Sequence, residues 1–256
     1  SQIAVGDGGR YALKACLSRS AAATVYAAFD TRLSRDVVIK VLKTTRNGAD
    51  AHAVAHAADL LAGVRLVARL QHPSMVTLFD AGLCGLDVYT AMERLEGGSL
   101  HDRLAQGWRP APQEALRVGA GIAAALAFVH EAGLLHGRVE PAHVFFFGPT
   151  QLKLLNCGAV GPDGGHDTLP VDAFGEPAPR ESSPYTAPEV LLGIALDARC
   201  DVYGLGLVMY EMLTGHTAFS GDSPQALRNA VLLSDVPEAH TRNPAVPRAL
   251  SSVLAR

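Results

Sequence analysis

The spacing of apolar and polar positions divides the chain into a strand-rich first third and a mostly helical remainder. Short runs rich in β-branched and aromatic residues, separated by polar turns, predict strands over 11–17, 24–30, 36–43, 75–81 and 87–95. An alanine-rich segment over 51–70, with apolar residues at helical spacing, predicts a helix among these strands. A strand-rich lobe followed by a helical lobe indicates an α+β fold.

The second part of the chain is organised by glycines and long helical patterns. Gly97 and Gly98 interrupt the chain, and Ser99 is suited to cap the helix that follows. The largely apolar segment 113–132 predicts a helix buried on most faces, and 202–213 predicts a further apolar helix that Gly215 ends. The segment 159–183 is rich in Gly, Pro and Asp and predicts a long surface loop.

Composition and charge narrow the class of protein. With 256 residues, 48% of them hydrophobic and 18% charged, the chain is globular and long enough to bury a core. The net charge of −3, without a basic block, argues against a nucleic-acid partner. No apolar run is long enough to span a bilayer. Scattered cysteines indicate no disulfide framework and predict a reducing, cytoplasmic location; they are Cys16, Cys84, Cys157 and Cys200.

Several short strings occur in the order in which protein kinases carry them. Val37-Val38-Ile39-Lys40 resembles the V-A-I-K strand, 91–100 resembles the linker between the two lobes, and Ala187-Pro188-Glu189 resembles the end of the activation segment. The segment 201–215 is similar to the buried helix of the large lobe. In the order and the residue types of these strings, the chain resembles bacterial serine/threonine protein kinases over 11–254. The resemblance implies a β-rich N-lobe with one main helix and a mostly helical C-lobe.

This resemblance also predicts the domain organisation. We expect a tag or linker over 1–10, the N-lobe over 11–92, the hinge over 93–98 and the C-lobe over 99–256. The final helix of the family is not recognised in the C-lobe.

The resemblance assigns Lys40 to the lysine that contacts the phosphates of ATP. The glutamate that pairs with this lysine in the family is replaced by Gly63, and Asp59 lies one turn away as a possible substitute. Glycines let backbone N–H groups approach phosphates in the family, because they have no Cβ. Their positions are taken here by Ser18, Ser20 and Ala23.

The resemblance places the catalytic loop at 136–143. Arg138 stands where the family has the aspartate that receives the substrate proton, and an arginine cannot act as a base. Glu140 stands where the family has a lysine that stabilises the transferring phosphoryl group. His143 and Asn156 replace the two magnesium ligands. The sequence therefore predicts no catalytic residue, no metal ligand, and loss or weakening of ATP and Mg²⁺ binding.

Residues that hold the scaffold together in the family are retained: His136, Pro141, Glu189 and Asp201. This selective loss predicts a pseudokinase, a non-enzymatic regulatory or scaffolding module. Its expected partners are other proteins, such as an active kinase or a phospho-recognition protein. One alternative is a nucleotide-binding switch that uses Lys40 and Arg138 without metal. Another is an atypical, weakly active phosphoryl or nucleotidyl transferase in which Glu140 serves as a base or metal ligand.

Four further groups of residues lead to smaller hypotheses about pockets, metal sites and modification. By the resemblance, Val38 and Phe145 lie on either side of the position that adenine takes in the family. Their large side chains predict a filled nucleotide pocket. A zinc site at His143 and Cys157 lacks a third ligand. Two histidines one helical turn apart predict a solvated helix face; they are His52 and His56. The loop before Ala187 contains two serines that are either phosphorylation sites or ordinary loop residues; they are Ser182 and Ser183.

Overall fold

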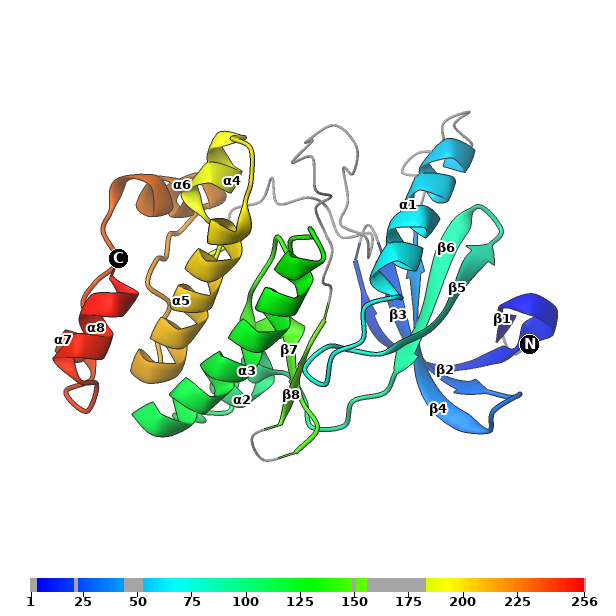
Figure 1. The fold of residues 1–256 in the computed structure, drawn as a ribbon, viewed down its shortest axis with the longest axis horizontal. Coiled ribbons are helices and arrows are strands. Elements are labelled where there is room, and N and C mark those ends of the chain that lie inside the picture. Colours follow the sequence, from blue (N-terminus) through cyan, green and yellow to red (C-terminus); the bar gives the residue numbers. More distant parts are fainter. Residues whose placement is uncertain (1–3, 21–22, 44–52, 149–150, 156–182, 256) are drawn as a thin grey trace.

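The computed structural model describes residues 4–20, 23–43, 53–148, 151–155 and 183–255. Within these residues the chain forms a β-sheet lobe and a helical lobe that lie at opposite ends of the molecule (Figure 1). The predicted α+β kinase-like architecture is confirmed. The exact boundaries of the predicted lobes and hinge stay a prediction.

The N-lobe is built on one antiparallel sheet with strand order β1-β2-β3-β4-β6-β5. The strands span Ala4–Val5, Tyr11–Arg19, Ala23–Asp30, Arg35–Leu42, Leu78–Cys84 and Asp87–Glu93 for β1 to β6. In β4, Val37 and Ile39 are fully buried on one face, while Val38 between them is half-buried. Because side chains alternate along a strand, Val38 and Lys40 lie on the other face, together with Leu42, which is also fully buried.

Helix α1 (Ala53–Val67) covers the sheet beside β5 and β6 (Figure 1). Its apolar side packs through Leu60 and Val64 onto Leu42 of β4 and Val88 of β6. The spacing of four residues between the two helix residues puts them on one face, as the sequence pattern predicts.

Part of the predicted tag or linker is packed against the sheet. Ala4 and Val5 form β1, which pairs with Ala12 and Tyr11 of β2, and Val5 is almost completely buried. Residues Asp7–Gly9 form a 3₁₀ turn (η1) that leads into β2.

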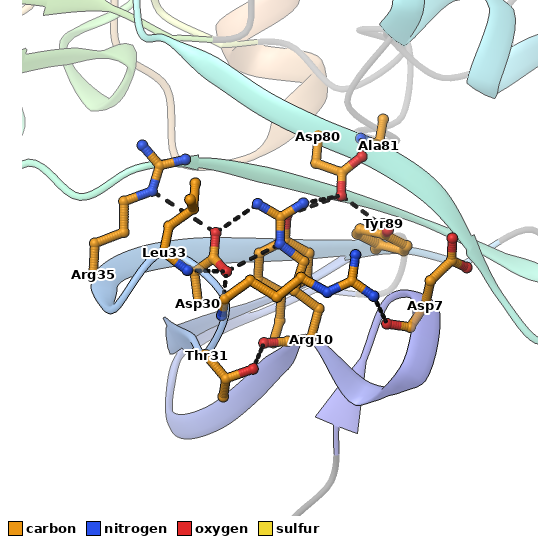
Figure 2. Close-up of polar contacts among 11 residues, drawn as sticks. Asp7, Arg10, Asp30, Thr31, Leu33, Arg35, Asp80, Ala81 and Tyr89 are labelled. Carbon is orange, nitrogen blue, oxygen red and sulfur yellow. Dashed lines mark hydrogen bonds and ion pairs between the residues drawn. The ribbon is translucent and has the colours of Figure 1, made fainter.

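A cluster of polar side chains joins several strands of the N-lobe sheet (Figure 2). The Asp30 carboxylate is fully buried and accepts two hydrogen bonds from Arg10, at 3.0 and 2.7 Å. These hydrogen bonds, together with those donated by the backbone, hold the pKa of Asp30 below its ordinary value. Asp80 of β5 accepts from Tyr11 Oη at 2.9 Å, so the cluster links β2, β3 and β5.

The connection between the lobes runs from the end of β6 to α2 (Leu100–Ala105). Ser99 caps α2: its hydroxyl accepts from Asp102 N, and Asp102 in turn accepts from Ser99 N. This reciprocal capping box satisfies backbone donors at the helix start. The predicted N-cap is confirmed.

The C-lobe is centred on α3 (Pro112–Glu131) and α5 (Ala198–Thr214), which lie side by side (Figure 1). Their facing residues are completely buried, including Val118 and Ile122 from α3 and Val208 and Met212 from α5. The remaining elements are η2 (Pro141–His143), β7 (Val144–Phe146), β8 (Leu152–Leu154), α4 (Pro188–Leu192), α6 (Pro224–Leu233), α7 (Ala239–Arg242) and α8 (Arg248–Leu254). No helix in the described ranges is both long and apolar enough to cross a bilayer.

Candidate active site

Lys40 lies on the central strand of the N-lobe sheet. It is 5% exposed and pairs with Val25 of β3 and Thr90 of β6. The positive charge of Lys40 reaches His143 of the C-lobe, where it contributes to lowering the histidine pKa. Lys40 therefore lies near enough to His143 for its charge to act there, although the two residues belong to different lobes.

The turn between β2 and β3 is closed by Ser20 and Ala23. Ser20 N donates to Ala23 O at 2.8 Å, and Ala23 N donates to the Ser20 hydroxyl oxygen at 3.0 Å. Ser18 is exposed on β2 and pairs with Val25. Of the three positions predicted to replace loop glycines, Ser18 thus lies within β2, while the N–H groups of Ser20 and Ala23 already have partners.

The catalytic loop is held in place by Asp201 of α5. This buried carboxylate accepts from His136 N at 2.8 Å and from Gly137 N at 2.7 Å, and it also contacts His130 Nε2 at 2.8 Å. Gly137 has a φ of 76°, a conformation that favours glycine. His136 is completely buried, with its Nε2 2.7 Å from Leu155 O. Pro141 begins η2, and Glu189 lies in α4.

Three polar side chains gather on the loop itself. Glu140 Oε1 lies 3.4 Å from Arg138 Nε and 3.6 Å from His143 Nε2. The Glu140 side chain is only 12% exposed, so its charge is poorly screened by water. Arg138 O lies 2.9 Å from His143 Nδ1, and a carbonyl can only accept, so Nδ1 carries the proton.

His143 is neutral in this setting. Burial lowers its pKa well below the ordinary value of 6.5, and the positive charges of Arg138 and Lys40 act in the same direction. The sequence alone could not show this cluster, because Lys40 is about a hundred positions from the loop.

A contact that the sequence did not predict joins the loop to the segment before α4. The Ser183 hydroxyl donates to Glu140 Oε2 at 3.3 Å. Ser183 is positioned by its own backbone N–H, which donates to Thr186 Oγ1 at 3.1 Å. The two serines before Ala187 were the only sequence signal for this contact, and Ser182 lies outside the described residues.

Other predicted positions are less informative. Gly63 lies in α1, and the structure describes the backbone but not the side chain of Asp59. The same holds for His56. Outside the described residues lie His52, Asn156, Cys157 and most of the predicted loop 159–183.

Val38 and Phe145 do not form part of a closed core. Both are half-buried, whereas their neighbours Ile39 and Phe146 are completely buried. The two side chains therefore keep contact with solvent.

The described residues do not form a magnesium site by themselves. Mg²⁺ prefers an octahedron of oxygen ligands, usually with one or two carboxylates. The catalytic loop offers the Glu140 carboxylate, which already contacts Arg138, and His143 offers nitrogen. Within the described ranges no group of three or more His, Cys, Asp or Glu residues could hold a metal ion.

Comparisons with known proteins agree with the fold. Residues 11–253 match the family described as "Protein kinase domain". A probable serine/threonine-protein kinase of Streptomyces coelicolor is 34% identical over 86% of this chain and 32% of its own length. The serine/threonine-protein kinase PknL of Mycobacterium tuberculosis is 30% identical over 96% of this chain and 59% of its own length. A crystal structure of Rad53 in complex with AMP-PNP has a TM-score of 0.74 and 18% identity, covering 97% of this chain and 61% of that one.

A two-lobed fold with a lysine on the central N-lobe strand and a histidine-led loop facing it defines a protein kinase domain, and the chain belongs to that family. Within the family it groups with the bacterial serine/threonine kinases. The chain spans between about a third and three fifths of the length of these curated relatives.

These comparisons contradict the prediction of a non-enzymatic pseudokinase. Relatives at 30–34% identity are named serine/threonine-protein kinases, a class of enzyme that transfers the γ-phosphoryl group of ATP. The prediction that ATP and Mg²⁺ binding is lost or weak is wrong for the same reason, because family membership points to their use. The error came from judging each side chain by its motif position alone. The loop still carries one carboxylate and one permanent cation, at Glu140 and Arg138.

Proposed function

We propose that this chain is a serine/threonine-protein kinase domain that transfers the γ-phosphoryl group of ATP to a protein hydroxyl. Its partners are then protein substrates. The proposal assigns Lys40 to the phosphates of ATP, Glu140 to the acceptor hydroxyl and Arg138 to the charge of the transferring group.

The observation that carries this proposal is the contact between Glu140 and a serine hydroxyl. A general base must lie within hydrogen-bond reach of the proton that it removes, and contacts are often long before the substrate complex forms. Glu140 Oε2 accepts from Ser183 Oγ at 3.3 Å, so the loop carboxylate already meets the kind of group that the relatives named above phosphorylate.

The loop also keeps both charges that phosphoryl transfer requires, in exchanged order. By resemblance, the family has a carboxylate at position 138 and a cation at position 140. This chain has Arg138 and Glu140, with Nε and Oε1 3.4 Å apart. The guanidinium and the carboxylate are close together. Exchanging the two residues therefore keeps one positive and one negative charge on the loop and moves each charge by only a few ångströms.

Positive charge is also available from the N-lobe. Phosphoryl transfer is catalysed mainly by positioning and by electrostatic stabilisation of the phosphate oxygens. Lys40 is buried on β4, where its interaction with an anion is stronger than in bulk water. Arg138 adds a planar fork of donors that suits phosphate.

The direct test is transfer of labelled phosphate from ATP to an added protein such as dephosphorylated casein, in buffer containing Mg²⁺. We expect wild-type protein to label the acceptor and Glu140→Gln to label it at least about a hundredfold more slowly, the lower range of general-base effects. Glu140→Gln keeps the shape of the side chain but removes its charge beside Arg138, so the rates are compared at a temperature below the unfolding midpoint of both proteins. Equal rates in the two proteins would contradict the assignment of Glu140 as the base.

A further inference from the structure

A groove between the hinge and the C-lobe has no role in the proposed transfer. Its volume is about 540 Å³, within the usual range for ligand pockets. The described residues that line it come from the hinge, from α2 and from the end of β7. They are Arg94, Glu96, Gly97, Arg103, Phe147 and Gly148. Because this lining shares no described residue with the candidate active site, the groove is a second place where a protein could be held.

We propose that this groove binds an acidic segment of the protein substrate, separate from the hydroxyl that receives the phosphate. The proposal rests on the proposed function and deepens it, because it names the class of protein that the domain selects. Three features of the groove carry it: an arginine held in place, a second arginine on the hinge, and an exposed aromatic ring.

Arg103 presents a guanidinium group that is already held in place. Its central carbon lies 3.6 Å from the centroid of the Phe146 ring and 5.8 Å from that of Trp108. Nη2 of Arg103 lies 3.4 Å from Gly148 O, at the end of β7. A guanidinium group fixed in this way loses little conformational freedom when it pairs with a carboxylate, so less of the binding free energy is spent on ordering it.

Arg94 adds a second positive charge from the hinge. Its side chain is 40% exposed, and its Nη1 lies 3.6 Å from Asp36 Oδ2, which is beyond hydrogen-bonding distance. Asp36 has a closer partner, because Lys14 Nζ lies 2.6 Å from its other oxygen, Oδ1. Arg94 can therefore turn toward a carboxylate in the groove while Lys14 still balances the charge of Asp36.

The charges around the groove favour an acidic partner. Glu96 is the one carboxylate among the described lining residues, which include two arginines. Beside the groove, Glu93 is paired with Lys153 and Asp36 with Lys14, so neither pair changes this balance. Complementary charge speeds association and discriminates against partners of the wrong sign. The groove therefore selects acidic segments over basic ones.

Phe147 gives the groove an apolar wall. Its side chain is 45% exposed, whereas the preceding residue, Phe146, is completely buried. Exposed aromatic side chains are enriched in binding surfaces, because they supply a large contact area at a small cost in conformational entropy. A segment with apolar residues between its carboxylates can therefore pack on Phe147 and pair with the two arginines at the same time.

Binding in the groove affects substrate capture and not the transfer step. Holding one part of a protein raises the local concentration of the rest of it near the catalytic loop. Such an interaction is the same before and during transfer, so its loss raises KM and leaves kcat unchanged. The ATP site is separate from the groove, so KM for ATP should also stay the same.

Binding is measured directly by fluorescence anisotropy, with a labelled octapeptide of alternating glutamate and leucine as the probe. We expect the wild-type chain to bind this peptide, and to bind it more weakly as salt screens the exposed charges. Arg94→Glu should weaken binding at least about tenfold, because it places like charges together. Phe147→Ser should weaken it about threefold or more, through lost apolar contact. The same peptide with lysine in place of glutamate should not bind.

Arg117→Glu is the matched control. Arg117 is an exposed arginine of α3 that does not line the groove, and its substitution changes the net charge as much as Arg94→Glu does. It should leave peptide binding unchanged. Equal losses in the two variants would mean general charge attraction and would overturn the inference, as would an absence of binding by the wild type. The three substituted side chains are exposed, and thermal unfolding checks that each variant is folded.

Transfer of phosphate to dephosphorylated casein, an acidic protein, separates this inference from the proposed function. We expect Arg94→Glu to raise KM for casein at least about fivefold, while kcat and KM for ATP keep their wild-type values. Transfer to casein without peptide binding overturns the inference and leaves the proposed function standing. Peptide binding without transfer overturns the proposed function and leaves the groove as a site for acidic segments. An equal rise in KM for ATP would show that Arg94 acts through the ATP site and would overturn the inference.

Discussion

A carboxylate and a guanidinium lie 3.4 Å apart on the catalytic loop, in the opposite order to that of the family. At the scale of single residues, this arrangement gives Glu140 three neighbours with distinct roles. Arg138 balances its charge, His143 stays neutral beside it, and Ser183 donates to it. The proposed chemistry depends on these distances and not on the position of each residue in a motif.

Asp30 provides a prediction about stability at the same scale. The carboxylate is fully buried and paired with Arg10, so Asp30→Asn removes the closer of the two carboxylates beside the guanidinium and leaves only Asp80, at 3.3 Å. Breaking a buried ion pair on one side typically costs about 3–5 kcal/mol. We expect a loss of this size in the free energy of unfolding at neutral pH, measured by urea denaturation.

The pH dependence of this effect follows from the direction of the pKa shift. The folded pKa of Asp30 lies below the ordinary value of 3.8, so its contribution is fully present above 3.8 and is lost as the pH falls through the folded pKa. The difference between wild type and Asp30→Asn should therefore narrow in acid. Asp36→Asn is the matched control, because this half-exposed aspartate pairs with Lys14 at the surface and should change stability little. Equal losses in the two variants would contradict this account.

Sequence patterns identified the residues of the candidate site but not their relations. Lys40, Arg138, Glu140 and His143 all lie in the site, and motif spacing was enough to find them. The contact between Glu140 and Ser183 could not be predicted, because it depends on how the chain returns over 43 positions. The prediction of an inactive protein was wrong because it assigned a role to each position separately and did not include this contact.

At the scale of elements, the hinge is held against the C-lobe by backbone contacts. Gly97 N donates to Phe146 O at 3.0 Å, and Phe146 N donates to Gly98 O at 3.0 Å. A Cβ on Gly97 would lie well inside contact distance of the Phe146 carbonyl. Only glycine fits there without moving β7 or the hinge.

Gly97→Ala should therefore destabilise the protein by about 1–3 kcal/mol, the usual cost of forcing extra volume into a packed region. Gly206→Ala in α5 is the matched control, because no described atom outside its own stretch of helix lies within 4 Å of an added Cβ. Alanine is the better helix former, so this variant should gain up to about 1 kcal/mol. Thermal unfolding of both variants measures the effects, and a neutral Gly97→Ala would show that the hinge tolerates displacement.

Most elements were predictable from periodicity, and the misses have local causes. The strand predicted over 75–81 begins only at Leu78, because Val76 N donates to Leu154 O and ties this segment to β8 instead. Helix α5 begins at Ala198, four residues before the predicted start, because Asp197 caps it by accepting from Arg199 N. Strand β1 has only two residues and carries no periodicity that a sequence could reveal.

At the scale of the whole molecule, each lobe supplies groups that the other lacks. The sheet lobe contributes Lys40, and the helical lobe contributes the loop that Asp201 holds. The two lobes interact electrostatically at His143, because the charge of Lys40 contributes to lowering the pKa of this C-lobe histidine. The proposed transfer of phosphate therefore depends on groups from both lobes.

The central claim is that Arg138 and Glu140 have exchanged places and still support transfer. The measurement that tests it most directly is the rate of labelled phosphate transfer from ATP to casein by four proteins. These are wild type, Glu140→Gln, Lys40→Ala as the baseline, and the double variant Arg138→Asp with Glu140→Lys, which restores the family order. We predict activity in the wild type and the double variant, and losses of about a hundredfold or more in the two single variants. Activity in the double variant with none above the baseline in the wild type would contradict the account.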